Sequence, residues 1–306
     1  MANYTFMAVG NPVFDIIETP YVRTDGRVLS GCSVNAALTV GKLGDRAIVV
    51  GAVGKDYENH MRDKLEQYGV DVYVFPSRET GGFYLKYLDE KMNDRILRVL
   101  GHADKIDISS IPSSIISSSK SVLFGPILDE LDIEDVRRFA EAGEHLVIVD
   151  PQGFVRERDG DIIRRVPNPR IRRIIEISDV FKPNEHEAAV LFPGRSPVHV
   201  AKRIVRIGAR IGIVTLAERG SVISVGEEVF WIPAYPTTPR DPTGCGDVYA
   251  GAFAYYFLKH DNPIEAAAFA SAAASLMVEA IGPDFRLDRK EVERRFEWIL
   301  ENIRRV

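Results

Sequence analysis

The sequence predicts an α/β protein in which helices cover both faces of one mostly parallel sheet, giving three layers of α/β/α type. Short apolar runs rich in β-branched residues alternate with helical patterns along most of the 306 residues. Such runs are typical of strands that are buried on both faces. Strands that alternate with helices in this way favour βαβ units around a single sheet. We therefore expect residues 1–306 to form one domain.

The predicted elements follow one another in a regular order. The strands are expected at residues 5–9, 47–50, 122–124, 146–149, 180–182 and 211–216. The intervening helices are expected at residues 33–43, 57–67, 133–142, 185–192 and 198–207. Three longer helices are expected to close the chain, at about residues 246–259, 263–280 and 289–305.

Two segments interrupt this alternation and predict a small β-structured lid inserted in the domain. Residues 12–30 contain no clear helical pattern, and residues 72–100 include the alternating run FYLKYL at 83–88. A pair of surface hairpins without function is the alternative explanation. Gly81 and Gly82 fit either a hinge of the lid or a β-bulge. The stretch 156–173 holds seven arginines, but interspersed acids favour a solvated surface over an anion-binding patch.

Composition excludes several classes of protein. The chain is 45% hydrophobic and 27% charged, which excludes a disordered chain. Its two cysteines exclude a disulfide scaffold and a four-thiolate zinc site. The strongly apolar stretch 266–274 is too short to span a membrane, and the N-terminus does not resemble a signal peptide. We expect a cytoplasmic protein, and the net charge of −5 argues against a nucleic-acid partner.

The strongest chemical signal is the segment DPTGCGD at residues 241–247, which is followed by a helical pattern. Two glycines allow a tight turn, and the helix that follows presents free N–H groups that suit a phosphate. A glycine-rich turn with Asp247 as a first-turn acid would explain the same residues. The segment is not a P-loop, and Tyr249 stands where a dinucleotide fingerprint needs its third glycine.

This segment resembles the C-terminal signature of the ribokinase-like, or phosphofructokinase-B type, family of sugar and nucleoside kinases. Four other segments resemble further family motifs, and the matches run in the family's order from residue 9 to about residue 282. They are SGCSVNAA at 30–37 with KLG at 42–44, GAVGKD at 51–56, NEHE at 184–187, and TLAERG at 215–220. The departures are Ser30 for glycine, Cys245 for alanine and Ala217 for glycine, and they bear on substrate identity.

The resemblance implies that Asp247 is the catalytic base acting on the acceptor hydroxyl. It also implies that the backbone N–H groups of Gly244, Cys245, Gly246 and Asp247 form an anion hole for the transferred phosphoryl group. Because carboxylates and thiols are acidified near a helix N-terminus, we expect lowered pKa values for Asp247 and Cys245.

The remaining site residues are also carried over from the resemblance. Substrate-binding residues are expected to be Asn11, Asp15, Gly31 and Asn35, and nucleotide-binding residues Asn184, Thr215, Glu218 and Gly220. Asn184 and Glu187 lie three apart, and an amide with a carboxylate suits Mg²⁺ held through water. Asp241 is expected near a monovalent-cation site such as one for K⁺.

Purely structural explanations remain open for several of these residues. Asn11 fits a turn, Asn35 the start of a helix, and Asn184 an N-cap. A surface turn explains Glu218 equally well.

We therefore expect a kinase that uses ATP and Mg²⁺ to phosphorylate a hydroxyl of a sugar or polyol. A nucleoside kinase of the adenosine, inosine or cytidine type is the alternative, because the opening Gly10-Asn11-Pro12 and the aromatic residues of the predicted lid suit a nucleoside. The aromatic residues in question are Tyr73, Phe75, Phe83, Tyr84 and Tyr87. A non-catalytic ligand-binding protein on the same fold is a distant alternative. By analogy with the family, a homodimer through the lid is expected.

Overall fold

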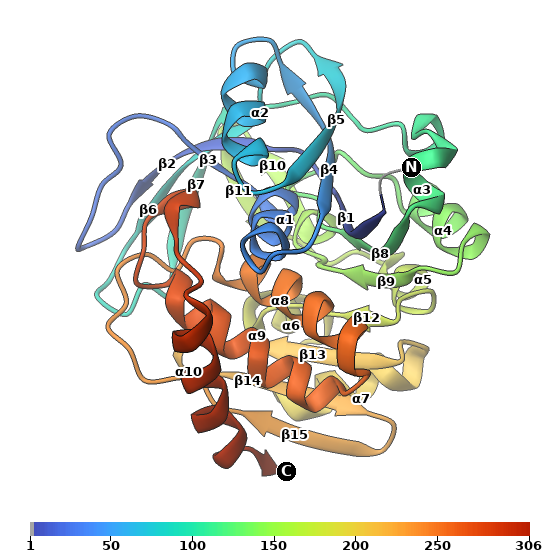
Figure 1. Ribbon diagram of the computed structural model, residues 1–306, viewed down its shortest axis with the longest axis vertical. Helices are drawn as coiled ribbons and strands as arrows, with labels where there is room; N and C mark the ends of the chain where they lie inside the picture. The colour runs from blue at the N-terminus through green and yellow to red at the C-terminus, as the bar shows by residue number, and fades with distance from the viewer. Residues whose placement is uncertain (1–2) are drawn as a thin grey trace.

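The computed structural model describes residues 3–306, and its main feature is a ten-stranded sheet (Figure 1). The strand order is β16-β15-β14-β13-β12-β9-β8-β1-β4-β5, parallel from β13 to β5 and antiparallel from β13 to β16. The strands are β1 (Tyr4–Val9), β4 (Ala47–Gly54), β5 (Val70–Ser77), β8 (Ser119–Phe124), β9 (Leu146–Val149), β12 (Val180–Phe181), β13 (Ile211–Thr215), β14 (Ser221–Val225), β15 (Glu228–Ile232) and β16 (Arg304–Arg305). The predicted mostly parallel sheet is confirmed.

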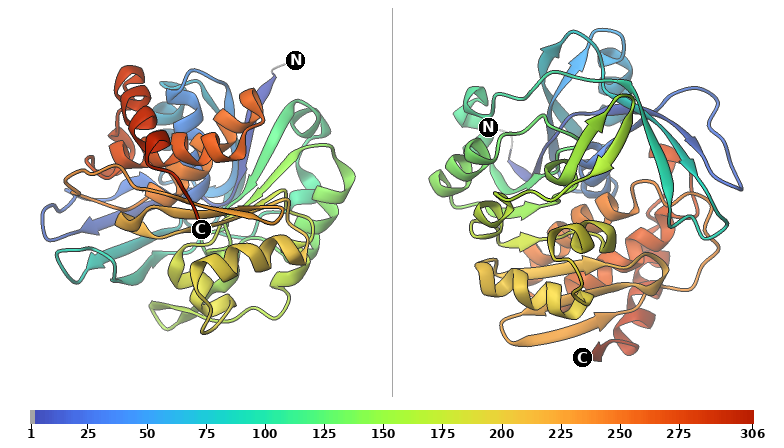
Figure 2. Two further views of the ribbon diagram at one scale, coloured as in Figure 1. Left: turned by 90° about the horizontal axis from the view of Figure 1, so that it is seen from below. Right: turned by 180° about the vertical axis from the view of Figure 1, so that it is seen from behind.

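Helices cover both faces of this sheet, so the predicted three layers are confirmed (Figure 2). One face carries α1 (Cys32–Lys42), α2 (Glu58–Glu66), α8 (Cys245–His260), α9 (Pro263–Met277) and α10 (Arg289–Glu301). The other carries α3 (Ser113–Ser117), α4 (Ile133–Ala142), α5 (Ile171–Ile175), α6 (Glu185–Leu191) and α7 (Pro197–Ile207).

Strand β1 illustrates why the parallel strands are apolar throughout. Phe6 and Ala8 enter the core on the side of α1 and α8, whereas Met7 and Val9 enter the core on the opposite side, and all four are fully buried. Successive side chains of a strand point to opposite faces, so a strand covered on both sides has no position for a polar residue.

The three closing helices lie close to their predicted positions. Asn262 caps α9, with Pro263 in its first turn, and Asp288 caps α10. The last helix ends at Glu301 rather than 305, because Arg304 and Arg305 form β16 beside β15. Among the described residues, no helix is long and apolar enough to cross a membrane.

A second, six-stranded sheet with the order β10-β11-β7-β6-β2-β3 forms the lid. Its strands are β2 (Val13–Glu18), β3 (Val28–Ser30), β6 (Gly82–Tyr87), β7 (Arg95–Gly101), β10 (Arg156–Asp159) and β11 (Ile162–Arg165). The segment 12–30 lies in it as predicted.

The predicted boundaries of the lid are wrong in two respects. Residues 72–77 belong to β5, which pairs with β4 in the main sheet. Val72 and Val74 pack against the core on one face of that sheet, and Tyr73 and Phe75 pack against the core on the other. The arginine-rich hairpin β10–β11 joins the lid through Ile162 and Arg98, so this part of the stretch 156–173 is not simply a solvated surface.

Gly82 makes a close backbone contact within the lid. A Cβ there would lie 2.3 Å from the carbonyl oxygen of Phe14, so only glycine fits. The β6–β7 pairing shifts its register between Gly82 and Phe83. Of the two explanations for Gly81 and Gly82, this geometry favours the bulge.

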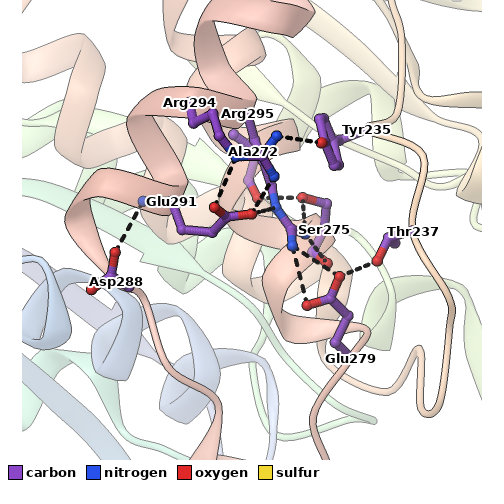
Figure 3. A network of polar contacts seen from close by, with 9 residues as sticks. All are labelled: Tyr235, Thr237, Ala272, Ser275, Glu279, Asp288, Glu291, Arg294 and Arg295. Carbon is purple, nitrogen blue, oxygen red and sulfur yellow. Dashed lines mark hydrogen bonds and ion pairs between the residues drawn. The ribbon is translucent and has the colours of Figure 1, made fainter.

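Arg295 joins α10 to α9 and to the loop between β15 and α8 (Figure 3). Its buried guanidinium lies 2.9 Å from Glu279 and 2.8 Å from Glu291, and it donates to the carbonyl oxygen of Ser275 at 2.9 Å. Glu279 accepts a hydrogen bond from Thr237 in that loop. A buried guanidinium with all its partners in place stabilises these three segments against one another.

We predict that Arg295→Met lowers the free energy of unfolding by about 1–3 kcal/mol, because it leaves the carbonyl oxygen of Ser275 and the partly exposed carboxylates of Glu279 and Glu291 without this donor. Urea denaturation measures this change. The matched control is Arg289→Met on the same helix, whose exposed guanidinium pairs with Glu293 four residues on. The control is expected to unfold almost like the unaltered chain, and equal losses in the two variants would contradict the assigned role of Arg295.

Candidate active site

One cavity of about 550 Å³ lies between the lid and the carboxyl ends of the central parallel strands. Asp150 directly follows β9, Asn184 is the third residue after β12, and Thr215 ends β13, and all three line the cavity. Ligands of open α/β sheets bind at this edge, because the loops there are free to carry polar groups.

The predicted anion loop lies against this cavity at the start of α8. Gly244 has φ +86°, and a Cβ on it would lie 2.6 Å from the side-chain nitrogen of Asn35. The N–H groups of Cys245 and Asp247 donate to Pro242 at 3.2 Å and to Gly244 at 3.0 Å. Within residues 3–306, the N–H groups of Gly244 and Gly246 make no hydrogen bond. Only these two of the four expected donors are therefore free for an anion.

Asp247 lies in the first turn of α8 and faces the cavity. The amide nitrogen of Asn35 donates to its Oδ2 at 3.0 Å, and the thiol of Cys32 lies within 4.8 Å of its carboxylate. The expected lowering of its pKa is wrong. Enclosure by protein and the nearby carboxylate of Asp150 raise the pKa of Asp247, and together they outweigh the helix dipole.

The expectation for Cys245 is also wrong, for the same reason. Burial, together with the carboxylates of Asp241 and Asp247, raises the pKa of the Cys245 thiol well above its ordinary value. The pKa of the Cys32 thiol is also raised, mainly by burial and then by the charge of Asp247. Neither thiol is therefore activated as a nucleophile.

Asp150 and Lys182 form a buried ion pair, with 2.7 Å between Oδ2 and Nζ, that no sequence motif indicated. Their side chains are only 6% and 3% exposed. Burial alone would lower the pKa of Lys182, but the charge of Asp150 and its hydrogen bond outweigh this effect and raise it. Cys32, Asp150 and Asp247 also bring their ligand atoms within 4.8 Å of one another. A charged residue directly after a fully apolar strand is the signal that could have identified Asp150 and Lys182.

Asn184 and Glu187 form a capping box at the start of α6. The Asn184 side chain accepts from the Glu187 N–H at 3.0 Å, and the Glu187 carboxylate accepts from the Asn184 N–H at 2.9 Å. The structural explanation of Asn184 is thus correct. Glu187 still faces the cavity, and burial together with Asp150 raises its pKa to about 7.

Asp15 lies at the lid end of the cavity, on β2, and is 3% exposed. Its Oδ1 accepts from the N–H of Phe83 at 2.8 Å. Burial raises the pKa of Asp15 to about 7, although this hydrogen bond and the charges of Arg95 and Arg156 oppose the rise. Gly31 lines the same end with φ +112°, a conformation that favours glycine.

Two expected substrate-binding residues do not line this cavity. Asn11 is buried; its Oδ1 accepts from the N–H of Ala52 at 2.8 Å, and its Nδ2 donates to the carbonyl of Asp104 at 3.0 Å. Asn35 lies behind Asp247 and orients its carboxylate. Both amides are thus engaged within the protein, through contacts that neither structural explanation includes.

The opposite end of the cavity contains Thr215, Glu218 and Gly220, as expected for nucleotide-binding residues. Gly220 has φ +85°, and a Cβ there would lie 2.1 Å from the carbonyl of Ile232. Only glycine fits at this contact, which sets the path of the loop that carries Glu218. Ala234, Tyr235 and Thr237, from the loop anchored by Arg295, line this end as well.

Asp241 lies beneath the anion loop and is fully buried. Its Oδ1 accepts from the N–H of Thr243 at 2.8 Å, whereas its Oδ2 has no hydrogen-bond partner within the part of the chain that the structure describes. A buried carboxylate oxygen without a donor fits the requirement of a bound cation.

The chain resembles known proteins over most of its length. The family model described as pfkB family carbohydrate kinase matches residues 12–289. Ribokinase of Bacillus subtilis is 28% identical over 272 residues, which cover 87% of each chain. A nucleoside kinase of Methanothermobacter thermautotrophicus is 26% identical over 309 residues, which cover 95% of this chain and 96% of its own.

Solved structures show the same fold. A pyrophosphate-dependent kinase of the ribokinase family superposes with a TM-score of 0.81 at 21% identity, over 94% of this chain and 99% of its own. Ribokinase of Thermotoga maritima superposes with a TM-score of 0.77 at 24% identity, over 96% and 99%. The predicted ribokinase-like fold is confirmed.

The catalytic segment, the order of the motifs and the fold agree with the family match. The chain therefore belongs to the pfkB family of carbohydrate kinases, phosphotransferases whose acceptor is a hydroxyl group of a sugar or a nucleoside.

Proposed function

We propose that this kinase transfers the γ-phosphate of ATP to a hydroxyl of a sugar or polyol, with Asp247 as the catalytic base. One observation carries the proposal: an enclosed carboxylate of raised pKa lies in the same helical turn as the free N–H groups of Gly244 and Gly246. A base and an anion-stabilising pair are thus held on one rigid element beside one cavity.

Asp247 accepts the proton of the attacking hydroxyl, and its raised pKa makes it a stronger base than an exposed aspartate. Asn35 holds its carboxylate toward the cavity, with the Cys32 thiol beside it. The N–H groups of Gly244 and Gly246 stabilise negative charge on the transferred phosphoryl group. Phosphoryl transfer depends mainly on alignment and charge stabilisation, and these groups supply both.

The donor is proposed to bind at the end of the cavity formed by Asn184, Thr215, Glu218 and Gly220. Lys182 adds a positive charge near the anion loop, since a Cβ on Gly246 would lie 3.6 Å from its Nζ. Mg²⁺, when bound, neutralises phosphate charge. Glu187, together with Asn184, is the group proposed to hold it through water, because Glu187 faces the cavity with a pKa of about 7.

A monovalent cation such as K⁺ is proposed beneath the anion loop, held by Asp241. The unpartnered Oδ2 of this residue supports the assignment. Such an ion, when bound, supplies positive charge under the loop. Asp241 also positions the turn before the loop through its hydrogen bond from Thr243.

A nucleoside acceptor is the second candidate, and the rings of Phe83 and Tyr87 in the cavity favour it. Fewer aromatic rings are free to stack on a nucleobase than the sequence predicts. Tyr73 and Phe75 pack against the core of the main sheet, and the Tyr84 hydroxyl donates to Glu18 at 2.7 Å. A non-catalytic binding protein is disfavoured by the arrangement around Asp247. A homodimer through the lid stays a proposal, supported by the exposed apolar side chain of Leu88 next to β6.

We predict that Asp247→Asn lowers kcat by about 10²- to 10⁴-fold while ATP still binds, because the isosteric amide cannot accept the proton. A coupled assay of ADP release and a titration with ATP measure the two effects. Asp261→Asn, at the exposed far end of the same helix, is the control. Turnover of Asp247→Asn comparable with that of the control would disprove the role of Asp247.

We further predict that kcat/KM for the acceptor, at saturating ATP, increases about tenfold between about pH 6 and about pH 8. The ionised carboxylate of Asp15 accepts hydrogen bonds from the acceptor, and its raised pKa of about 7 leaves it mostly protonated below that pH. Asp15→Asn is expected to abolish this dependence at a lower overall rate. A flat profile in the unaltered enzyme would contradict the assignment.

A further inference from the structure

Three arginines from separate strands of the lid line the same cavity. They are Arg95 on β7, Arg156 on β10 and Arg165 on β11. Arg156 and Arg165 come from the arginine-rich stretch, and the reaction proposed above assigns no role to any of the three. Among residues 3–306, none of them lies within 4.0 Å of a carboxylate oxygen.

Their neighbours on the same strands behave differently. Arg98 on β7 pairs with Asp161 at 3.2 Å, and Arg164 on β11 pairs with Asp159 at 2.7 Å. Alternation along a strand places these two on the face of the lid away from the cavity. The outward arginines of the lid are thus neutralised, whereas Arg95, Arg156 and Arg165 are not.

The polar contacts of the three leave most of their donors free. Arg95 donates to the hydroxyl of Tyr87 at 2.8 Å, and Arg156 donates to the carbonyl of Ile127 at 2.9 Å. A guanidinium has five N–H donors, so several on each side chain have no protein acceptor. Burial and the positive charge of Arg95 lower the pKa of Arg156 to about 10, and the carboxylates of Glu187 and Asp150 only partly oppose this.

The charges of Asp247, Asp15, Asp150 and Glu187 act on Arg95 or Arg156, and each of these carboxylates already has a partner in the protein; Asp247 accepts from Asn35. Asp15 accepts from the N–H of Phe83, Asp150 pairs with Lys182, and Glu187 belongs to the capping box of α6. An anion that enters from solution would therefore meet guanidinium donors that no protein group occupies.

The position of the cluster assigns the anion to the acceptor rather than to the donor. Arg95, Arg156 and Arg165 lie in the same sheet as Asp15, and the charges of Arg95 and Arg156 act on that carboxylate. Of the proposed donor residues, Thr215, Glu218 and Gly220 belong instead to β13 and to the turn that follows it. Glu187, at the start of α6, is the one residue of the proposed donor and Mg²⁺ site whose charge acts on Arg156 and Arg165, so the experiments below include the donor as an outcome.

We propose that the acceptor carries, besides its reacting hydroxyl, an anionic substituent such as a phosphate monoester or a carboxylate, and that Arg95, Arg156 and Arg165 bind this group. The proposal rests on the proposed function and narrows its substrate class from sugars and polyols to their acidic derivatives. Asp15 binds hydroxyls of the same molecule, and the arginines hold its charged end beneath the lid.

The first test compares acceptors in pairs that differ only in charge, for example ribose against a ribose phosphate monoester and glucose against glucuronate. With ATP as donor, kcat/KM for the anionic member is expected to exceed that of its neutral partner by about 100-fold. Inorganic sulfate is the second probe, and it is expected to inhibit competitively against the acceptor, an inhibition that Arg165→Met weakens.

The second test replaces the arginines singly by methionine. Arg165→Met and Arg156→Met are each expected to lower kcat/KM for the anionic acceptor by about 30-fold, and to leave the KM for ATP unchanged. Arg98→Met and Arg164→Met are the matched controls, since they remove outward arginines from the same strands. Arg165 is exposed, so its replacement does not put folding at risk, and thermal melts confirm this for each variant.

Three results would overturn the proposal. They are equal use of neutral and anionic acceptors, equal losses in the control variants, and competition of sulfate with ATP together with a raised KM for ATP in the arginine variants. The last result would assign the arginines to the donor phosphates. Efficient phosphorylation of neutral acceptors would reject this proposal alone, whereas absence of transfer to every acceptor would reject the proposed function itself.

Discussion

The close packing of α8 against α1 is the constraint on which the reaction centre depends. A Cβ on Gly251 would lie 2.3 Å from the carbonyl of Ala36, so the two helix backbones touch where a side chain would separate them. At the start of α8, Gly244 approaches Asn35 in the same way. Because the helices are this close, Asn35 of α1 reaches the carboxylate of Asp247 and orients it toward the cavity.

The electrostatics of the cavity follow from enclosing several acids under one lid. Asp15, Asp247 and Glu187 all have raised pKa values, with burial as the largest cause in each case. Lys182 pairs directly with Asp150, and its charge only partly offsets the rise in the pKa values of Asp247 and Glu187. The positive charge that would balance a ligand's anionic groups comes from the free N–H groups of α8 and from arginines of the lid. Low local polarity strengthens each of these interactions, and it also makes each unpaired group costly.

The lid brings together pieces of chain that are far apart in sequence. Strands β2 and β3, β6 and β7, and β10 and β11 come from three separate segments, and they contribute Asp15, Arg95 and Arg156 to one cavity wall. On the opposite side, the Arg295 network ties α10 and α9 to the loop that holds Tyr235 and Thr237 (Figure 3). Both walls therefore depend on contacts between elements distant along the chain.

The sequence by itself determined the alternation of strands and helices, the anion loop and its acid, and the family. These features are local: apolar periodicity, a glycine turn before a helix, and short motifs in a fixed order. Only the tertiary structure decided which polar residues meet. It raised the pKa values of Asp247 and Cys245, because burial and neighbouring carboxylates outweigh a helix dipole that is visible in sequence.

The same distinction explains which expected residues lie outside the cavity lining and which lining residues no motif indicated. Asn11 and Asn35 carry polar side chains near the right motifs, yet their amides are engaged by partners that only folding brings near. Lys182 and Asp150 are 32 residues apart, and Arg95 and Arg156 lie on strands that no local pattern pairs. Sequence periodicity specifies the face of an element, whereas burial and charge at a site depend on what packs against that face.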